Sequence, residues 1–141
     1  MPAEAISESV EGVDIIFRGF SAKRMAVVRP AIMRDVRLLP PWVKALSVEY
    51  TRSKKHSGAC VQCTPENHLA KMWLGVKWFD YPAHLRRVYV IHEINHMHHW
   101  AEADFVLAHM PASHRPAYLK LHEQSTDTWA YAVLAATEGA T

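Results

Sequence analysis

One stretch of the sequence decides the fold: residues 82–100, Pro-Ala-His-Leu-Arg-Arg-Val-Tyr-Val-Ile-His-Glu-Ile-Asn-His-Met-His-His-Trp. Pro82 suits the start of a helix, because its φ angle is already helical and the first turn does not use its missing N–H. We expect this helix to run to about Trp100, with Asp80 as its cap. The apolar run Val88-Tyr-Val-Ile provides a wall that can seat the helix on a sheet.

The middle of this helix carries the pattern His-Glu-x-x-His, formed by His92, Glu93 and His96. Residues four apart lie on one helix face, so both imidazoles can reach a single ion. Neutral imidazole binds zinc well, at about 2.0–2.1 Å. Glu93 is displaced around the helix, where it can take a proton from water whose pKa zinc lowers from 15.7 toward about 7. The pattern therefore predicts a zinc site with a general base beside it.

A third metal ligand has to come from another part of the chain. His99 shares the histidine face but lies about 10 Å along the axis from His92, too far for one ion on an unbroken helix. Glu102 stands at the third-ligand position of the metzincin pattern, but the helix-breaking glycine of that pattern is replaced by His99. His109 and His114 lie in a predicted connector and can approach the metal from there.

Glu123 is the best candidate for the third ligand, and Asp127 follows it by one helical turn. A zinc-bound histidine commonly donates its other N–H to a carboxylate. We therefore expect Glu123 to bind the metal and Asp127 to orient His92 or His96. Two histidines and one carboxylate leave the fourth position of zinc open for water, as catalytic zinc requires.

The rest of the chain predicts an α+β domain, with a small mixed or antiparallel sheet packed on the 82–100 helix and on a C-terminal helix. Residues 1–12 are expected to be frayed. The other predicted elements are a strand at 13–17, a helix from Ser21 to Leu39 that Pro30 kinks or restarts, strands at 46–51, around Cys60 and at 72–79, and, after a connector containing Pro111, a helix from about Pro116 to Gly139.

Length and composition limit the class of protein. The 141 residues predict a single domain over 1–141, and a half-apolar chain can bury a core. Because 16 Lys and Arg residues nearly balance 14 Asp and Glu residues, we expect no dedicated nucleic-acid binding. We see no secretory signal and no apolar run long enough for a membrane span, so we expect a cytoplasmic protein. Cys60 and Cys63 lack the two further ligands of a structural zinc site and are expected to be reduced thiols in or beside a strand.

The pattern His92-Glu-x-x-His96 followed on the next helix by Glu123-x-x-x-Asp127 resembles that of the gluzincins, a group of zinc metallopeptidases. In layout the chain is most similar to their minimal members, the ImmA/IrrE-type peptidases. The likeness includes the Arg-rich entry to the helix and the Trp129-Ala pair after Asp127. The resemblance implies a zinc metalloendopeptidase with Zn²⁺ as cofactor. It also implies that the predicted strand at 72–79 is an edge strand that pairs with an extended peptide substrate.

Two questions stay open at the level of sequence. A peptidase usually has a second electrophile for the oxyanion, and we expect His109 or His114 in this role rather than Arg115, Tyr118 or Tyr131. The alternative function is a zinc-binding regulatory or interaction module with the same fold and little activity. Glu93 favours the enzyme, because a purely structural site needs no base. The expected partner is a protein or peptide substrate, which can be a single specific protein.

Overall fold

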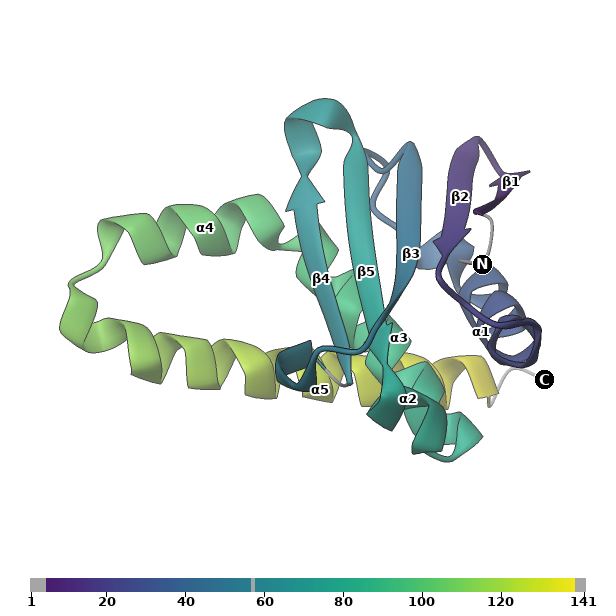
Figure 1. Cartoon of the computed structure of the whole chain (residues 1–141). Coiled ribbons are helices and arrows are strands. Elements are labelled where there is room, and N and C mark those ends of the chain that lie inside the picture. Colours follow the sequence, from purple (N-terminus) through teal and green to yellow (C-terminus); the bar gives the residue numbers. More distant parts are fainter. Residues whose placement is uncertain (1–4, 57, 139–141) are drawn as a thin grey trace.

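A mixed sheet forms the centre of the molecule in the computed structural model, which describes residues 5–56 and 58–138 (Figure 1). Within these residues the sheet has five strands in the order β1-β2-β3-β5-β4. β2, β3 and β5 run parallel, while β1 and β4 pair antiparallel at the two edges. The strands are β1 Ile6–Val10, β2 Val13–Arg18, β3 Ala45–Thr51, β4 Ala59–Thr64 and β5 Leu69–Gly75. The prediction of one small α+β domain with a mixed sheet is confirmed.

Five helices accompany the sheet in the part of the chain that the structure describes. They are α1 Ala22–Arg34, α2 Val76–Asp80, α3 Ala83–His98, α4 Trp100–His109 and α5 Arg115–Glu138. Short 3-10 turns join them, the last being η4 Ala112–His114 between α4 and α5. None of the helices in these described ranges is both long enough and apolar enough to cross a membrane.

One face of the sheet is apolar and is covered by helices. Alternate strand residues such as Leu46 and Val48 of β3 and Met72 of β5 are fully buried, as the two-residue period of a pleated strand requires. They pack in one core with residues of α1 and α3. The opposite face carries polar contacts, in which Glu49 accepts from Ser47 and pairs with Lys71 at 3.4 Å. The sheet therefore has one core face, and α3 lies on it.

α3 is buried on two sides. Val90, Ile94 and Met97 face the sheet core, while Val88 and Ile91 pack against Ala130 and Leu134 of α5 in a second cluster. Each fully buried aliphatic side chain of this size stabilises the fold by roughly 1.5–3 kcal/mol. α3 is thus held between the sheet and α5, with its remaining side free for polar residues.

The prediction of a frayed N-terminus is wrong for the described part of 1–12. Ile6–Val10 is a strand that pairs with β2. A two-residue turn joins the two strands, with φ of 51° at Glu11 and 80° at Gly12. Positive φ at both central residues is typical of a type I′ hairpin turn, which the twist of paired strands favours. Residues 1–4 lie outside the described residues.

The predicted strand at 72–79 is wrong in both its bounds and its place. β5 ends at Gly75, and Val76–Asp80 forms the short helix α2. The cause is Trp78, which is completely buried and whose indole N–H donates to the Arg86 carbonyl at 3.1 Å. β5 also lies inside the sheet between β3 and β4. The edge strand beside α3 is β4. The strand edge expected to pair with an extended peptide is therefore that of β4 and not that of residues 72–79.

The helical predictions are mostly confirmed, with differences at the helix ends. Ser21 accepts a hydrogen bond from the Arg24 N–H at 3.2 Å and so caps α1, which continues through Pro30 to Arg34. The cap of α3 is Pro82, not Asp80, which is the last residue of α2. Gly139, the expected end of α5, lies outside the described residues.

Most of the predicted connector is a helix. His99 caps the end of α3 and Trp100 begins α4, which contains three alanines and ends where Met110 precedes Pro111. No local sequence signal separates this helix from α3, because a single residue lies between them.

Candidate metal centre

The third side of α3 carries the histidines. His92 and His96 lie one turn apart on it. His92 is 6% exposed, and His96 is partly buried. Since Val88 and Ile91 fix this helix against α5, the two imidazoles point along the border between α3 and α5. Glu123 of α5 lies at that border. Two helices that are separate in sequence thus bring the three side chains together through the α3–α5 packing.

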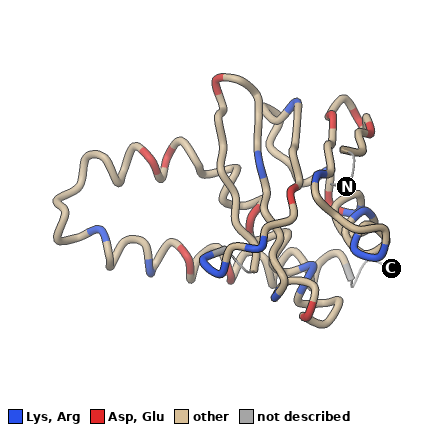
Figure 2. The backbone as a smooth tube through the Cα atoms, in the orientation of Figure 1, with Lys and Arg blue, Asp and Glu red and all other residues tan. Residues whose placement is uncertain are grey.

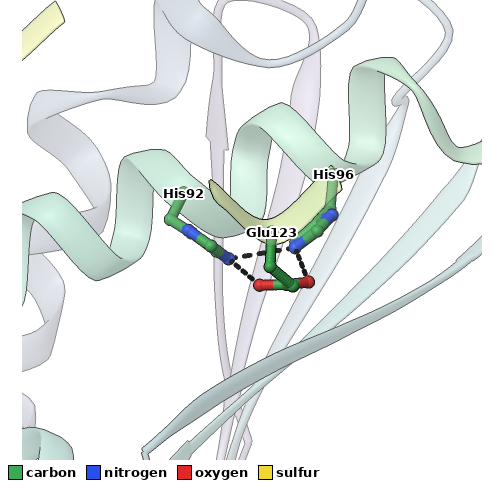
Figure 3. Close-up of side chains that lie close together, drawn as sticks. All are labelled: His92, His96 and Glu123. Atoms are coloured by element: carbon green, nitrogen blue, oxygen red, sulfur yellow. Dashed lines mark hydrogen bonds and ion pairs between the residues drawn. The ribbon is translucent and has the colours of Figure 1, made fainter. Parts of the chain in front are cut away.

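The structure brings His92, His96 and Glu123 together in a triad (Figure 3). The Nε2 atom of His92 lies 3.0 Å from Oε2 of Glu123, and the Nε2 atom of His96 lies 2.9 Å from Oε1. The two Nε2 atoms are 3.0 Å apart. Figure 3 shows both rings projecting from one helix toward a carboxylate on another. Three potential ligand atoms therefore converge on one point.

The donor set fits zinc. Ligand atoms at about 2.0–2.1 Å around a tetrahedral ion are about 3.3–3.4 Å from one another. The three observed separations of 2.9–3.0 Å are a few tenths of an ångström shorter, as hydrogen-bonded atoms are. To hold a zinc ion, these atoms would have to lie a few tenths of an ångström further apart than they do here.

Asp127 fixes the orientation of His92. Its Oδ1 atom lies 2.7 Å from Nδ1 of His92, so this ring nitrogen donates to the carboxylate. When the ring is neutral, that hydrogen bond leaves Nε2, the atom that faces Glu123, without a proton and able to bind a metal. Of the two histidines considered for Asp127, the structure places it at His92.

The electrostatics favour a charged Glu123. Hydrogen bonds from His92 and His96 lower the pKa of Glu123 far below its usual range, although burial opposes this shift. Burial alone would lower the pKa of His92, but the hydrogen bond to Glu123 and the nearby carboxylates outweigh it, and the net shift is upward. The triad thus gathers negative charge around the imidazoles, as a cation site requires.

Glu93 lies beside the triad but is not part of it. It is 6% exposed, and within residues 5–56 and 58–138 its carboxylate makes no side-chain hydrogen bond. Burial raises its pKa to about 8, helped by the charges of Glu123 and Asp127 and opposed by His92. A buried carboxyl without a partner, poised near neutral pH, is typical of a group that exchanges protons.

A pocket of about 320 Å³ opens in front of the triad. Its walls come from β4, α3 and α5, with Trp100 at the start of α4. The residues that line it are Ala59, Cys60, Val61, Glu93, His96, Trp100 and Glu123. Glu93, His96 and Glu123 therefore share one pocket, beside the edge strand of the sheet.

The structure does not bring the other predicted residues to the triad. His109 ends α4, where its ring stacks on Phe105 and its Nδ1 atom lies 2.8 Å from the Phe105 carbonyl. His114 ends η4, at the tip of the α4–α5 hairpin away from the sheet (Figure 1). His99 and Glu102 contact each other at 3.4 Å on the exposed side of the chain. The predicted connector was expected to fold back over the metal, but α4 and α5 hold it extended.

The sequence analysis overlooked two neighbours of the triad. The His122 ring lies 5.1 Å from that of His96, and burial and the His96 charge lower the pKa of His122. Trp100 lines the pocket. Trp100 follows His96 by four residues, so helical spacing alone could have predicted that it lies near His96. His122 directly precedes Glu123, and only the crossing angle of α3 and α5 places its ring at His96.

The cysteines are unpaired, as the sequence predicts. Cys60 and Cys63 both lie in β4 and are free thiols. Burial, with a smaller effect from Glu93, raises the pKa of Cys63 to about 12 and also raises that of Cys60. Both thiols are therefore protonated and unreactive at neutral pH.

No family model, curated protein or solved structure matches the chain. The interpretation of the site thus depends on its own geometry.

Proposed function

We propose that the protein is a zinc-dependent metallopeptidase, with His92, His96 and Glu123 as ligands and Glu93 as general base. One observation carries this proposal: the largely buried side chain of Glu93 lines the same pocket as His96 and Glu123. A structural metal site has no use for a carboxyl group that faces such a pocket, and burying a carboxylate is costly for a fold. Its presence beside the triad supports hydrolysis over simple metal storage.

Each residue has a role in the proposed reaction. Zinc, when bound, supplies Lewis acidity that makes water a nucleophile near neutral pH. In its ionised form Glu93 would take a proton from the attacking water and then deliver it to the amine that leaves the cleaved peptide bond. Asp127 keeps the His92 ring in the tautomer that presents Nε2 to the metal.

The substrate class that suits the pocket is an extended peptide. β4 pairs with β5 on one side only, within the described residues, and its residues 59–61 line the pocket. An unpaired strand edge offers backbone N–H and C=O groups that hydrogen-bond an extended chain. A peptide added to β4 runs past Glu93 and the triad, which supports a peptidase over other zinc hydrolases.

The test is hydrolysis by matched variants. Purified protein loaded with one equivalent of zinc is incubated with an unbiased peptide library, and the products are read by mass spectrometry. Wild type is expected to cleave, and Glu93→Gln is expected to retain zinc but lose at least about 100-fold in rate, the contribution of a positioned base. Glu66→Gln, at an exposed carboxylate outside the pocket, serves as control and retains activity. Undiminished cleavage by Glu93→Gln rules out this mechanism, and zinc binding without any cleavage favours the regulatory module.

A further inference from the structure

The hairpin formed by α4 and the start of α5 has no core of its own. We call α4 (Trp100–His109) and residues 115–125 of α5 the hairpin arms. Figure 1 shows the arms extending together from the side of the sheet. No residue from 100 to 125 is buried, although several are large and apolar. These are Phe105, Val106, Leu107, Met110, Tyr118, Leu119 and Leu121, whereas Trp100 at the base packs against the sheet core.

The hairpin arms do not stabilise each other. The second half of α5 packs closely on α3, but the arms stand apart along their length (Figure 1). A pocket of about 270 Å³ lies between their bases, bounded by Glu102 and Ala103 on one arm and Tyr118 and His122 on the other. An isolated helix of ten residues such as α4 is marginal in water without packing. The exposed apolar side chains therefore need a partner surface.

Charge identifies that partner. Glu102 and Asp104 are the charged residues of α4, while Arg115 and Lys120 are those at the start of α5, before Glu123 (Figure 2). One arm is thus acidic and the other basic. A uniformly acidic or basic partner is repelled by one of the arms. A second copy of the chain, turned by a two-fold axis, places its basic arm on the acidic arm and its acidic arm on the basic one.

We propose that the hairpin arms form a homodimer interface, in which α4 of one chain packs on residues 115–125 of α5 of the other chain and the reverse. The four helices then share a core made from the exposed apolar residues of both chains. Phe105, 64% exposed, and Leu121, 65% exposed, are the side chains that gain most from this burial. This inference does not depend on the metal or on the proposed peptidase activity, because it rests on exposed apolar residues and on four charged residues that take no part in the proposed reaction. The apolar residues are Phe105, Leu119 and Leu121, and the charged ones are Glu102, Asp104, Arg115 and Lys120.

The first test is the mass of the protein in solution. Light scattering after size exclusion, with chelator present to prevent metal bridging, is expected to give twice the chain mass of 16.1 kDa. Concentrations up to about 100 µM detect dimers of micromolar affinity. Phe105→Asp and Leu121→Asp are each expected to give the mass of one chain. Val76→Asp, at an exposed apolar residue of α2, is the matched control and stays dimeric. A wild-type monomer throughout this range overturns the proposal.

The second test fixes the pairing of the arms. One chain carries Glu102→Lys with Asp104→Lys, which makes both of its arms basic. The other carries Arg115→Glu with Lys120→Glu, which makes both arms acidic. Each variant alone is expected to be monomeric at low salt, and an equal mixture is expected to recover a dimer that contains one chain of each kind. Circular dichroism checks that both variants are folded. A mixture that stays monomeric, or variants that dimerise alone as well as wild type, overturns the pairing of α4 with α5.

Discussion

At the scale of single residues, the site depends on the carboxyl group of Glu93, whose burial disfavours its charged form. Glu93 is buried without a side-chain partner among the described residues, whereas Glu123, a few ångströms from the same imidazoles, accepts hydrogen bonds from two histidines. The pKa values of the two carboxyls consequently shift in opposite directions. Such a pair, one group ionised and one able to exchange its proton, is the arrangement on which acid–base chemistry depends.

The burial of Glu93 predicts a pH-dependent cost to stability. Folding raises the pKa of Glu93 from 4.5 to about 8. The protonated carboxyl therefore contributes its full stabilisation below pH 4.5, and this contribution is lost as the pH rises through about 8. Glu93→Gln carries no charge, so it escapes the loss. In chelator, its free energy of unfolding is expected to exceed that of wild type by about 3–4 kcal/mol near pH 9 and to approach it near pH 5.

Denaturant titrations at both pH values measure this difference. Glu66→Gln, at an exposed carboxylate of a 3-10 turn, is the control and should show no such trend. If the stability difference between Glu93→Gln and wild type does not change with pH, Glu93 is not a buried carboxyl with a raised pKa.

Asp127 predicts a second effect at this scale. Without the hydrogen bond at His92 Nδ1, the ring can rotate and adopt the other tautomer, so Asp127→Ala is expected to weaken zinc binding by about 10–100-fold. Competition with a chelator of known affinity measures the change. Glu66→Ala is the matched control, and unaltered affinity in Asp127→Ala would show that the ring is held by its packing alone.

At the scale of elements, the contact between α3 and α5 sets the geometry of the site. Ile91 and Ala130 are completely buried in it; Ile91 directly precedes His92, and Ala130 follows Asp127 by about one turn. Ile91→Ala is expected to reduce the free energy of unfolding by about 2–4 kcal/mol and to weaken metal binding as well, because the two ligand-bearing helices lose their register. Unfolding curves and zinc titrations of the same sample check both effects.

The control for this prediction is Val76→Ala, at a residue 46% exposed on α2, where a change within about 0.5 kcal/mol is expected. An Ile91→Ala protein that loses stability but keeps its zinc affinity would show that the triad is positioned by other contacts.

Sequence could predict some elements and not others for identifiable reasons. The helix around His92 and the cap at Ser21 were predictable because both follow from local spacing and hydrogen bonding. The boundary at Gly75 was not, because a short apolar run such as 72–79 fits a strand and a buried helix equally well. β1 contains polar residues on both faces, and only its turn and its pairing with β2 make it a strand.

The same distinction applies to the site. That His92 and His96 share a face follows from the period of a helix, but the approach of Glu123 depends on how α5 crosses α3, which no local pattern contains. His109 and His114 were attractive only while the segment between the helices was taken for a flexible connector. The helix α4 removes them from the triad by extending the chain away from it (Figure 1).

At the scale of the whole molecule, three parts have separate tasks. The sheet and α1 supply the core, and α3 lies between that core and α5 with its histidine face exposed to a pocket. The hairpin arms extend beyond the core and carry the surface that we assign to a second chain. α5 carries both Glu123 of the triad and one of the hairpin arms.

The central claim is that His92, His96 and Glu123 bind one zinc ion. The most direct measurement is zinc per chain by elemental analysis, after reconstitution and removal of loosely bound metal, on wild type beside Glu123→Ala and His109→Ala. The account predicts one zinc per chain in wild type and in the His109→Ala control, and a marked loss in Glu123→Ala. No zinc in reconstituted wild type, or full retention by Glu123→Ala, would contradict the claim.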